Sequence, residues 1–524
     1  MSRTAAALPD DVQALKDIIL AQRELLGTQQ RRIEHLLEQF RLARHRQFGA
    51  SSEKAPGQGE FFNEAEYLSR VVAEEEPPPQ AGDASPTAPR SRGVRKPLPP
   101  ELPRVQIRHV LPEEQRRCAC GCELRVIGEE ESEQLDVIPA RIQVLHHIRE
   151  RYACSRCEAA PVLAPWPAQP IPKSNASAGL LAHIAVAKYQ DGLPLHRQEH
   201  ILARSGIDLS RQTLARWMIR VAELAQPVLN LLWDELLSNP LIHCDETTVQ
   251  VLKEPDKPPT SHSYMWALAA GPPQRSVVLF DYHPSRSGEV PKRLLAGFSG
   301  YLMTDGYEGY NSLCAEDAVK HLCCMAHARR RFRDAQRAQP PGTTGRADVA
   351  IEYFRKLYQI ERKIAAADPE TRYRTRQSES VPLLRRFRAW LDAALTHVAP
   401  KGVLGEALKY LDKYWPKLVR YCEDGRLPID NNRLENNIRP FVIGRKAWLF
   451  SDTPAGAHAS AGLYSLIETA KSTRIEPYSY LRQLFTALPH ATQVEHFEAL
   501  LPWNVDRSLV APIERSRQPS RAAD

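Results

Sequence analysis

The chain has 524 residues, of which 43% are hydrophobic and 25% charged, a composition typical of a globular protein with enough apolar material for more than one domain. No run of about 18 apolar residues occurs, which excludes a membrane span, and the N-terminus lacks the pattern of a secretory signal, so a cytoplasmic protein is expected. The net charge of +7 is compatible with a nucleic-acid partner, and the 10 cysteines, several closely spaced, favour metal binding over disulfides.

The N-terminal segment, residues 8–48, has apolar residues at alternating steps of three and four. The series is interrupted at Gln22 and Gln29, but the spacing still predicts a coiled-coil helix through which two copies of the chain associate. The alternative is a helix that packs on its own chain. The apolar positions are Val12, Leu15, Ile19, Leu26, Ile33, Leu36 and Phe40. Residues 49–103, rich in Pro, Glu and Arg, have the composition of a disordered linker.

Two tight cysteine clusters mark the next region, residues 104–172. Cys154 and Cys157 have the C-x-x-C spacing of zinc ligands, and strand-like sequence precedes them. The first cluster is irregular, with Cys118 and Cys120 as the expected ligand pair and Cys122 as the alternative to either one. This pattern predicts a zinc-ribbon-like domain that holds a structural Zn²⁺ ion in tetrahedral sulfur coordination. The other interpretation is that the thiols are free and buried.

Residues 173–228 have a helical pattern that is typical of a helix-turn-helix DNA-binding domain. Gly206 would supply the turn and Ser210 would cap the second helix. Arg211, Gln212 and Arg216 lie early on that helix, which is the end that enters the major groove in such domains. A small helical bundle without DNA contact is the alternative.

Three acidic residues between positions 229 and 475 are candidates for catalysis. Asp245 and Asp305 each follow a short apolar run, as expected where a buried strand ends, and Glu435 falls in the first turns of a helix that Asp430 or Asn431 would cap. Any one of them could be an ordinary turn or cap residue. Together they suit two Mg²⁺ or Mn²⁺ ions roughly 4 Å apart that act on a phosphodiester.

The elements around these residues suggest the fold of this region. Strands are expected at 241–252, 261–270, 276–282 and 300–304, with a helix at 291–296 before the last strand. That order is expected of an RNase H-like α/β core of the retroviral-integrase type, which amphipathic helices at about 335–425 interrupt as an insertion. Residues 476–524 form a C-terminal segment with a loose tail. The fold class is therefore multidomain α+β.

Basic residues near the candidate carboxylates are expected to contact the DNA backbone. They are His327, Arg330, Arg433, Arg439, Arg445 and Lys446. Cys324 and His327 also form a C-x-x-H pair. One such pair is a weak metal-binding signal, and we expect Cys323 and Cys324 to be core residues of a strand.

Many short motifs in one order resemble the transposases of the insertion-sequence-sixty-six family, the large DDE proteins of bacterial mobile elements. They lie at residues 48–54, 189–198, 243–247, 304–307, 326–330, 430–435, 444–446 and 468–471. The resemblance implies a zinc-binding region, a helix-turn-helix and a split RNase H-like domain with the triad Asp245, Asp305 and Glu435. It implies Mg²⁺-dependent cutting and joining of double-stranded DNA, at terminal inverted repeats and target sites, in the bacterial nucleoid, with accessory proteins of the same element as further partners.

Two other functions fit parts of the sequence. One is a DNA-binding regulator with a zinc ribbon and a helix-turn-helix whose RNase H-like core is catalytically silent. The other is a nuclease of the same fold without specificity for transposon ends.

Overall fold

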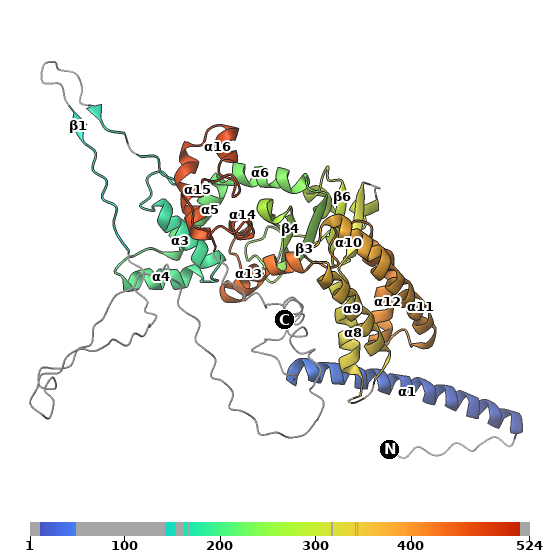
Figure 1. Ribbon diagram of the computed structural model, residues 1–524. Helices are drawn as coiled ribbons and strands as arrows, with labels where there is room; N and C mark the ends of the chain where they lie inside the picture. The colour runs from blue at the N-terminus through green and yellow to red at the C-terminus, as the bar shows by residue number, and fades with distance from the viewer. Residues whose placement is uncertain are drawn as a thin grey trace, which may run out of the picture. The chain divides into compact units, whose positions relative to one another are not determined.

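The computed structural model describes residues 11–48, 142–152, 162–165, 167–315, 318–340, 342 and 344–513 (Figure 1). These residues fall into two compact units, one within Met1–Glu75 and Ala168–Asp524 and the other within Glu76–Pro167. Each unit is described by itself. Within the described residues, every helix is too short or too polar to span a bilayer.

The smaller unit contains a short antiparallel hairpin. Strand β1 (Arg151–Tyr152) pairs with β2 (Val162–Leu163), with Arg151 opposite Leu163. Cys154 and Cys157 fall between the two strands in the sequence, but they lie outside the described residues, as do Cys118, Cys120 and Cys122. The predicted zinc ligands therefore remain a prediction.

The N-terminal helix α1 (Val12–Phe48) belongs to the larger unit. Several of its large apolar side chains are exposed, and among the described ones they are Ile19, Leu20, Leu25, Leu26, Ile33, Leu36, Leu37 and Phe40. The helix also contacts its own chain: it approaches α8 and α12, and the Val403 amide donates a hydrogen bond to Glu38 Oε2 at 3.3 Å. The exposed apolar side chains among the described residues form a surface that is available for contact with another molecule.

A group of helices between residues 178 and 237 directly precedes the sheet of the larger unit. They are α3 (Ala178–Tyr189), α4 (Leu195–Arg204), α5 (Arg211–Leu224) and α6 (Gln226–Leu237). Gly206, with φ of +75°, allows the chain to turn between α4 and α5. Ser210 accepts a hydrogen bond from the Thr213 amide at 3.3 Å and so caps α5. The predicted turn and cap are confirmed.

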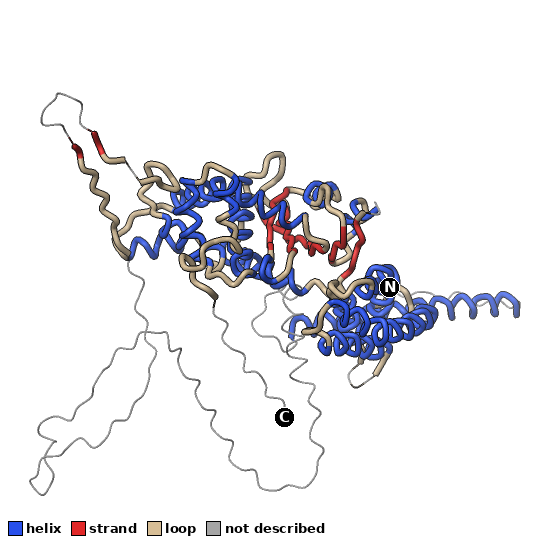
Figure 2. Tube along the Cα trace, turned by 45° about the horizontal axis from the view of Figure 1, so that its top comes forward, coloured by secondary structure: helices blue, strands red, loops and turns tan. Residues whose placement is uncertain are grey.

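A mixed five-stranded sheet has the order β5-β4-β3-β6-β7. Figure 2 shows its strands in red, with helices around them. Strands β3, β4 and β5 are antiparallel neighbours, whereas β6 and β7 run parallel to β3. Helix α7 (Glu289–Leu294) connects β5 to β6. The strands are β3 (Leu241–Gln250), β4 (His262–Ala270), β5 (Val277–His283), β6 (Gly300–Thr304) and β7 (Val319–Cys323). The predicted succession along the chain, three strands, a helix and a further strand, is confirmed, and the fold class is α+β.

Strand β3 lies close to its expected range of 241–252, but it does not end at Asp245 as the apolar run before this residue suggested. Asp245 lies in the middle of β3, because the strand continues through Thr247, Thr248 and Val249 and pairs with β4 as far as Gln250. Threonine and valine favour strands, which explains the continuation. The parallel pairing of β3 with β6, however, extends only from Leu241 to His243. On the β4 side, Asp245 therefore lies in the middle of the paired region. On the β6 side, it lies two residues beyond the last paired residue, His243.

Strand β5 forms one edge of the sheet, and helix α14 (Pro454–Ser472) covers this edge. The last four α-helices of the described residues are α13 (Asn432–Trp448), α14, α15 (Pro477–Ala487) and α16 (Val494–Glu498). Hydroxyls on α14 replace a neighbouring strand: Ser465 Oγ accepts from the Phe280 amide at 2.8 Å, and Thr469 Oγ1 accepts from the Val278 amide at 3.0 Å. The edge is thus closed to further strand pairing.

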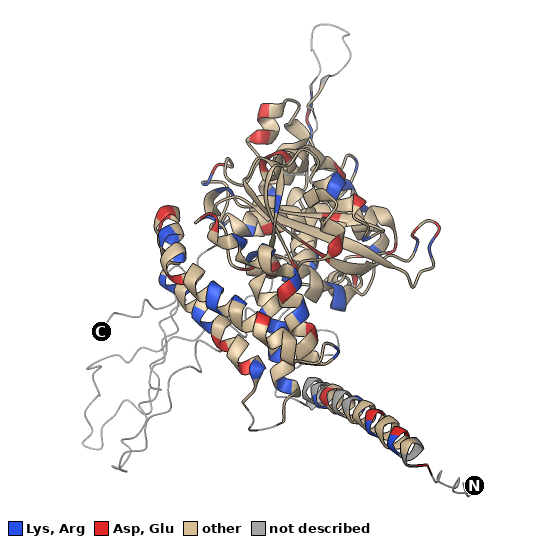
Figure 3. Cartoon of the chain, turned by 90° about the vertical axis from the view of Figure 1, so that its right-hand side faces the viewer, with Lys and Arg blue, Asp and Glu red and all other residues tan. Residues whose placement is uncertain are grey.

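A helical segment lies between β7 and α13. Its elements are α8 (Met325–Ala338), α9 (Arg346–Lys363), α10 (Pro369–Thr375), a π-helix (Arg376–Ser380), α11 (Val381–His397) and α12 (Val403–Val419). It has its own apolar core, which includes Phe332, Phe354, Phe387 and Leu411. Along its helices Lys and Arg recur among Asp and Glu (Figure 3).

Candidate active site

The parallel register of the sheet explains how Asp245 and Asp305 come together. His243 on β3 lies opposite Met303 on β6. Two residues after each of them comes an aspartate, Asp245 after His243 and Asp305 after Met303. Asp305 directly follows the last residue of β6, so its side chain leaves from the carboxyl end of that strand. In open α/β sheets this is the edge where ligands bind.

Glu435 reaches the same place from the first turn of α13. Asn431, the residue before this helix, is buried and is held by two contacts. Its Oδ1 lies 2.7 Å from His243 Nδ1, and its amide donates to Cys324 Sγ at 3.2 Å. Burial lowers the pKa of His243 to about 4, so this imidazole is neutral at physiological pH. These contacts fix the start of α13 against β3 and α8, and thereby orient Glu435.

Asp245 lies in a crowded, negatively charged environment. Burial raises its pKa well above the ordinary value, and the charges of Glu246, Asp305 and Glu435 raise it further. Its Oδ1 accepts from the Glu246 amide at 2.8 Å, whereas its Oδ2 is buried and has no hydrogen-bond partner among the described residues. A buried carboxylate oxygen of this kind, surrounded by other carboxylates, fits a divalent cation with hard oxygen ligands.

Glu246 is a fourth acidic residue that the sequence reasoning missed. Successive strand side chains point to opposite faces, so Glu246 lies on the other face of β3 from Asp245. Its carboxylate accepts from Tyr310 Oη at 2.6 Å and from Arg286 Nε at 2.6 Å. The pKa of Glu246 is raised by burial and then by the charge of Asp305, while Tyr310 and Arg286 oppose this rise. Only its position next to Asp245 could have indicated it.

The backbone around Asp305 is held by the helical segment. Asp305 Oδ1 accepts from the Tyr307 amide at 2.8 Å, and its carbonyl accepts from Tyr410 Oη of α12 at 2.8 Å. Gly306 has φ of +94°, and a Cβ there would lie 3.2 Å from the ring of Tyr414. The residue after the aspartate is therefore a glycine for both conformational and steric reasons.

A polar chain joins α12 to the end of β6. Lys417 Nζ donates to His321 Nδ1 at 2.9 Å, which leaves His321 Nε2 as the protonated nitrogen. That nitrogen lies 2.7 Å from Thr304 Oγ1, which also accepts from the Gly306 amide at 3.1 Å. Burial and then the positive charges of Lys417 and Arg420 lower the pKa of His321 to about 3. This series of hydrogen bonds holds the turn at Asp305 in place.

A cavity of about 390 Å³ lies beside Asp305, between the sheet and α12. Its lining combines basic and aromatic side chains with two acidic ones, Asp305 and Glu308, and Glu308 forms an ion pair with Lys413. The basic residues are Arg286, Arg331, Lys409 and Lys413, and the aromatic ones are Tyr307, Tyr410 and Tyr414. Cations and aromatic faces together suit a nucleic-acid strand. The i, i+4 spacing of Lys409, Lys413 and Lys417 was the available sequence signal.

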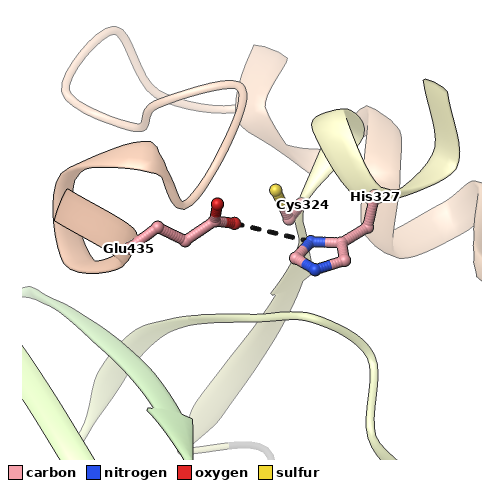
Figure 4. A group of neighbouring side chains, drawn as sticks. All are labelled: Cys324, His327 and Glu435. Carbon is pink, nitrogen blue, oxygen red and sulfur yellow. Dashed lines mark ion pairs between the residues drawn. The ribbon is translucent and has the colours of Figure 1, made fainter. Parts of the chain in front are cut away.

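Cys324, His327 and Glu435 form a second group of donor atoms (Figure 4). Cys324 is not a strand residue as expected but the residue before α8, because β7 ends at Cys323. Its sulfur, one imidazole nitrogen of His327 and a carboxylate oxygen of Glu435 lie within 4.8 Å of one another. His327 Nδ1 is 3.8 Å from Glu435 Oε1. The C-x-x-H pair, which was a weak metal-binding signal in the sequence, thus lies directly beside the carboxylate of Glu435.

The remaining predicted DNA-binding residues are in different surroundings. Arg433 Nη2 donates to the Ala270 carbonyl at 3.0 Å and to Ser276 Oγ at 2.8 Å, and Arg445 Nη1 donates to Thr247 Oγ1 at 3.0 Å. Both guanidinium groups are thus engaged with the strands. Lys446 is exposed, and Arg330 and Arg439 are half-buried. Arg211, Gln212 and Arg216 are exposed on α5, away from the groups that surround Asp245.

Four family models match the chain. One, described as Transposase IS66 family, matches residues 173–459 and includes all three candidate carboxylates. The zinc-finger binding domain of transposase IS66 matches residues 115–158, and the IS66 C-terminal element matches residues 465–503. A fourth model, described as Transposase C of IS166 homeodomain, matches residues 35–107.

Relatives from Sinorhizobium fredii (strain NBRC 101917 / NGR234) match most of the chain. Uncharacterized protein y4jD is 34% identical over 78% of this chain and 81% of its own length. Uncharacterized protein y4qI is 32% identical over 95% of this chain and 98% of its own length. Uncharacterized protein y4hP is 29% identical over 94% of this chain and 88% of its own length.

A mixed sheet and a helix bring acidic residues together in this chain, and a DDE transposase model matches it from residue 173 to 459. The protein is therefore a DDE-type transposase, which is an enzyme. The chain belongs to the Transposase IS66 family. Membership implies DNA transposition, a DNA partner, a divalent metal in the catalytic domain and zinc in the zinc-finger region.

Proposed function

We propose that this protein binds transposon ends and catalyses metal-dependent DNA strand cleavage and strand transfer, with Asp245, Asp305 and Glu435 as its metal ligands. The observation that carries the proposal is the electrostatic state of Asp245. Its buried carboxyl is surrounded by other acidic groups that raise its pKa, and one of its oxygens has no partner among the described residues. Such an arrangement is unfavourable until cations neutralise it.

The sheet topology supports an RNase H-like core for this chemistry. Three antiparallel strands followed by two parallel ones carry one aspartate on the central strand β3 and one after its parallel neighbour β6. The three carboxylates would hold two divalent ions such as Mg²⁺ or Mn²⁺. When bound, these ions would supply Lewis-acid stabilisation of charge on the phosphate oxygens.

The side chains around the carboxylates bind and orient the DNA. Arg286, Arg331, Lys409 and Lys413 would neutralise phosphates of the strand that enters the cavity beside Asp305. Tyr410 and the Lys417–His321–Thr304 chain hold the Asp305 turn in the geometry that ligand binding needs. His327, Arg330, Arg433, Arg439, Arg445 and Lys446 are further candidates for contact with the DNA backbone.

The regions before the catalytic core would recognise the ends and pair them. The exposed residues Arg211, Gln212 and Arg216 at the start of α5 would read the terminal inverted repeat in the major groove. The zinc ribbon at 104–172 would be closed by Cys154 and Cys157 with two cysteines of the first cluster. The exposed apolar residues of α1 support self-association through residues 8–48.

The test is cleavage and joining of a labelled duplex that carries the element's own end, in Mg²⁺, by the wild type and by Asp305→Asn. Asp506→Asn, at an exposed acidic residue, is the matched control. We expect the wild type and the control to cut, and Asp305→Asn to lose at least a hundredfold in rate, because a metal ligand is removed. Equal rates for all three proteins would reject the proposal.

The alternative is a DNA-binding regulator with a silent core. It is favoured by the exposed basic start of α5 and by the zinc-finger match, neither of which requires catalysis. It predicts tight binding of end DNA with no cutting by any variant. A nuclease without end specificity would instead cut unrelated duplexes as fast as the element's own end.

A further inference from the structure

The strongest unassigned feature is the group formed by Cys324, His327 and Glu435 (Figure 4). Cys324 precedes α8 and His327 lies three residues later, so both donors are on the same side of the first helical turn. Glu435 faces them from the first turn of α13. All three donor atoms lie within 4.8 Å of one another. Thiolate, imidazole and carboxylate are the ligands that Zn²⁺ takes in proteins.

Two further observations point to a ligand between these side chains. His327 Nδ1 is buried and makes no hydrogen bond within the described part of the chain, although it lies 3.8 Å from Glu435 Oε1. That separation is too long for a hydrogen bond but close to the spacing of about 3.3–3.7 Å between two ligands of one tetrahedral Zn²⁺ ion. The three donors would need to approach by only about an ångström.

The surroundings of Cys324 suit a metal-binding sulfur. Its Sγ accepts a hydrogen bond from the Asn431 amide at 3.2 Å, the kind of outer contact that orients ligating atoms. It also lies at the N-terminus of α8, a helix of 14 residues, where the helix dipole favours a thiolate. A sulfur ligand selects Zn²⁺ or Co²⁺ over Mg²⁺, because Mg²⁺ prefers oxygen.

We propose that Cys324, His327 and Glu435 form a site for a thiophilic divalent cation, distinct from the carboxylate site, and that an ion bound there takes Glu435 away from Asp245 and Asp305. Zn²⁺ would then inhibit DNA cleavage in Mg²⁺. The site itself is independent of the activity, whereas the inhibition rests on the proposed function. Glu435 is the shared ligand, so an ion that draws its carboxylate toward Cys324 and His327 competes with the carboxylate site for it.

Binding is tested without DNA by titrating the full-length protein with Co²⁺. The bound equivalents are counted by equilibrium dialysis, and sulfur ligation is read from thiolate-to-Co²⁺ charge-transfer absorption. The wild type is compared with Cys324→Ser and His327→Ala, and Cys314→Ser, at a half-buried thiol elsewhere, is the control. We expect both site variants to bind one equivalent less than the wild type and the control. Cys324→Ser should also lose the part of the charge-transfer absorption that this site adds to the absorption of the zinc-ribbon cysteines.

Equal numbers of Co²⁺ equivalents in all four proteins would overturn the site. If Cys324→Ser fails to fold by circular dichroism, His327→Ala decides alone, because this side chain is 22% exposed and its loss leaves the core intact. For the inhibition, each protein's cleavage rate in Mg²⁺ is divided by its rate with added Zn²⁺. We expect a ratio of at least ten for the wild type and Cys314→Ser, and a ratio near one for His327→Ala.

These outcomes separate the two proposals. A wild type that binds the additional Co²⁺ equivalent but never cuts DNA would contradict the proposed function and leave the site standing. A wild type that cuts DNA, binds no more Co²⁺ than the site variants and is unaffected by Zn²⁺ would contradict the site alone.

Discussion

The hydroxyl of Tyr410 donates a hydrogen bond of 2.8 Å to the backbone carbonyl of Asp305. Tyr410 belongs to α12 of the helical segment, and Asp305 directly follows β6 of the sheet. The segment between β7 and α13 therefore does more than lengthen the chain. It holds the turn that carries one of the candidate metal ligands.

Tyr410→Phe should lower the cleavage rate without unfolding the protein. The substitution removes one hydrogen bond of about 1 kcal/mol, so we expect a rate roughly fivefold lower. Tyr373→Phe, at an exposed tyrosine of α10, is the matched control and should have no effect. The measurement is the single-turnover cleavage rate in Mg²⁺. An unchanged rate for Tyr410→Phe would show that the Asp305 turn does not depend on α12.

His321 should make the folded protein less stable at acidic pH. Its pKa is lowered from 6.5 to about 3 in the folded chain. Below pH 6.5 the unfolded chain therefore binds a proton that the folded chain excludes. Stability is fully present above the unfolded pKa and falls by about 1.4 kcal/mol for each pH unit below it. His321→Asn should thus lose less stability than the wild type between pH 7 and pH 5, by about 2 kcal/mol.

Thermal unfolding followed by circular dichroism at both pH values measures this difference. His262→Asn, at an exposed histidine of β4, serves as the control and should follow the wild type. If His321→Asn showed the same acid sensitivity as the wild type, the neutral buried imidazole would not be its source.

Asp245→Asn should stabilise the metal-free protein while removing its response to Mg²⁺. The substitution takes one buried charge out of a group of repelling carboxylates, so a rise in Tm of about 2–4 °C is expected. Added Mg²⁺ should raise the Tm of the wild type but not that of the variant. A lower Tm in the variant, or the same Mg²⁺ response in both proteins, would argue against a strained acidic site.

Arg211→Ala should weaken binding to the element's end by roughly 5–30-fold and reduce the salt dependence. Arg211 is exposed at the first position of α5. Arg220→Ala is a control on the same helix, because Arg220 lies toward the other end and pairs with Glu223 at 3.0 Å. Titration of a fluorescent duplex at several salt concentrations measures both effects. Equal losses in the two variants would exclude a specific contact at the start of α5.

The strands and helices of the larger unit were predictable because their hydrophobic periods are regular. Asp305 after β6 and Glu435 in the first turn of α13 lie where the sequence placed them. Asp245 does not end its strand, since the β-branched residues that follow it continue the pairing with β4. A local pattern marks where an apolar run stops but not how far the neighbouring strand extends.

The support around the carboxylates could not be predicted, because it depends on contacts distant in sequence. Tyr410 is in the helical segment and meets Asp305 only after folding. Cys324 was expected in the strand core, but β7 ends one residue earlier and its sulfur lies beside Glu435. Glu246 was passed over because, apart from its position next to Asp245, nothing in the local sequence distinguishes it from any polar strand residue. These residues acquire their roles through tertiary structure.

The most direct test of the catalytic proposal is Glu435→Gln, assayed beside the wild type on a labelled duplex that carries the element's end. Glutamine keeps the shape of the side chain but removes its charge, so binding to DNA should be kept while cleavage in Mg²⁺ falls at least a hundredfold. Glu495→Gln, at an exposed glutamate of α16, should cut like the wild type. Cleavage by Glu435→Gln at the wild-type rate would contradict the proposed metal site.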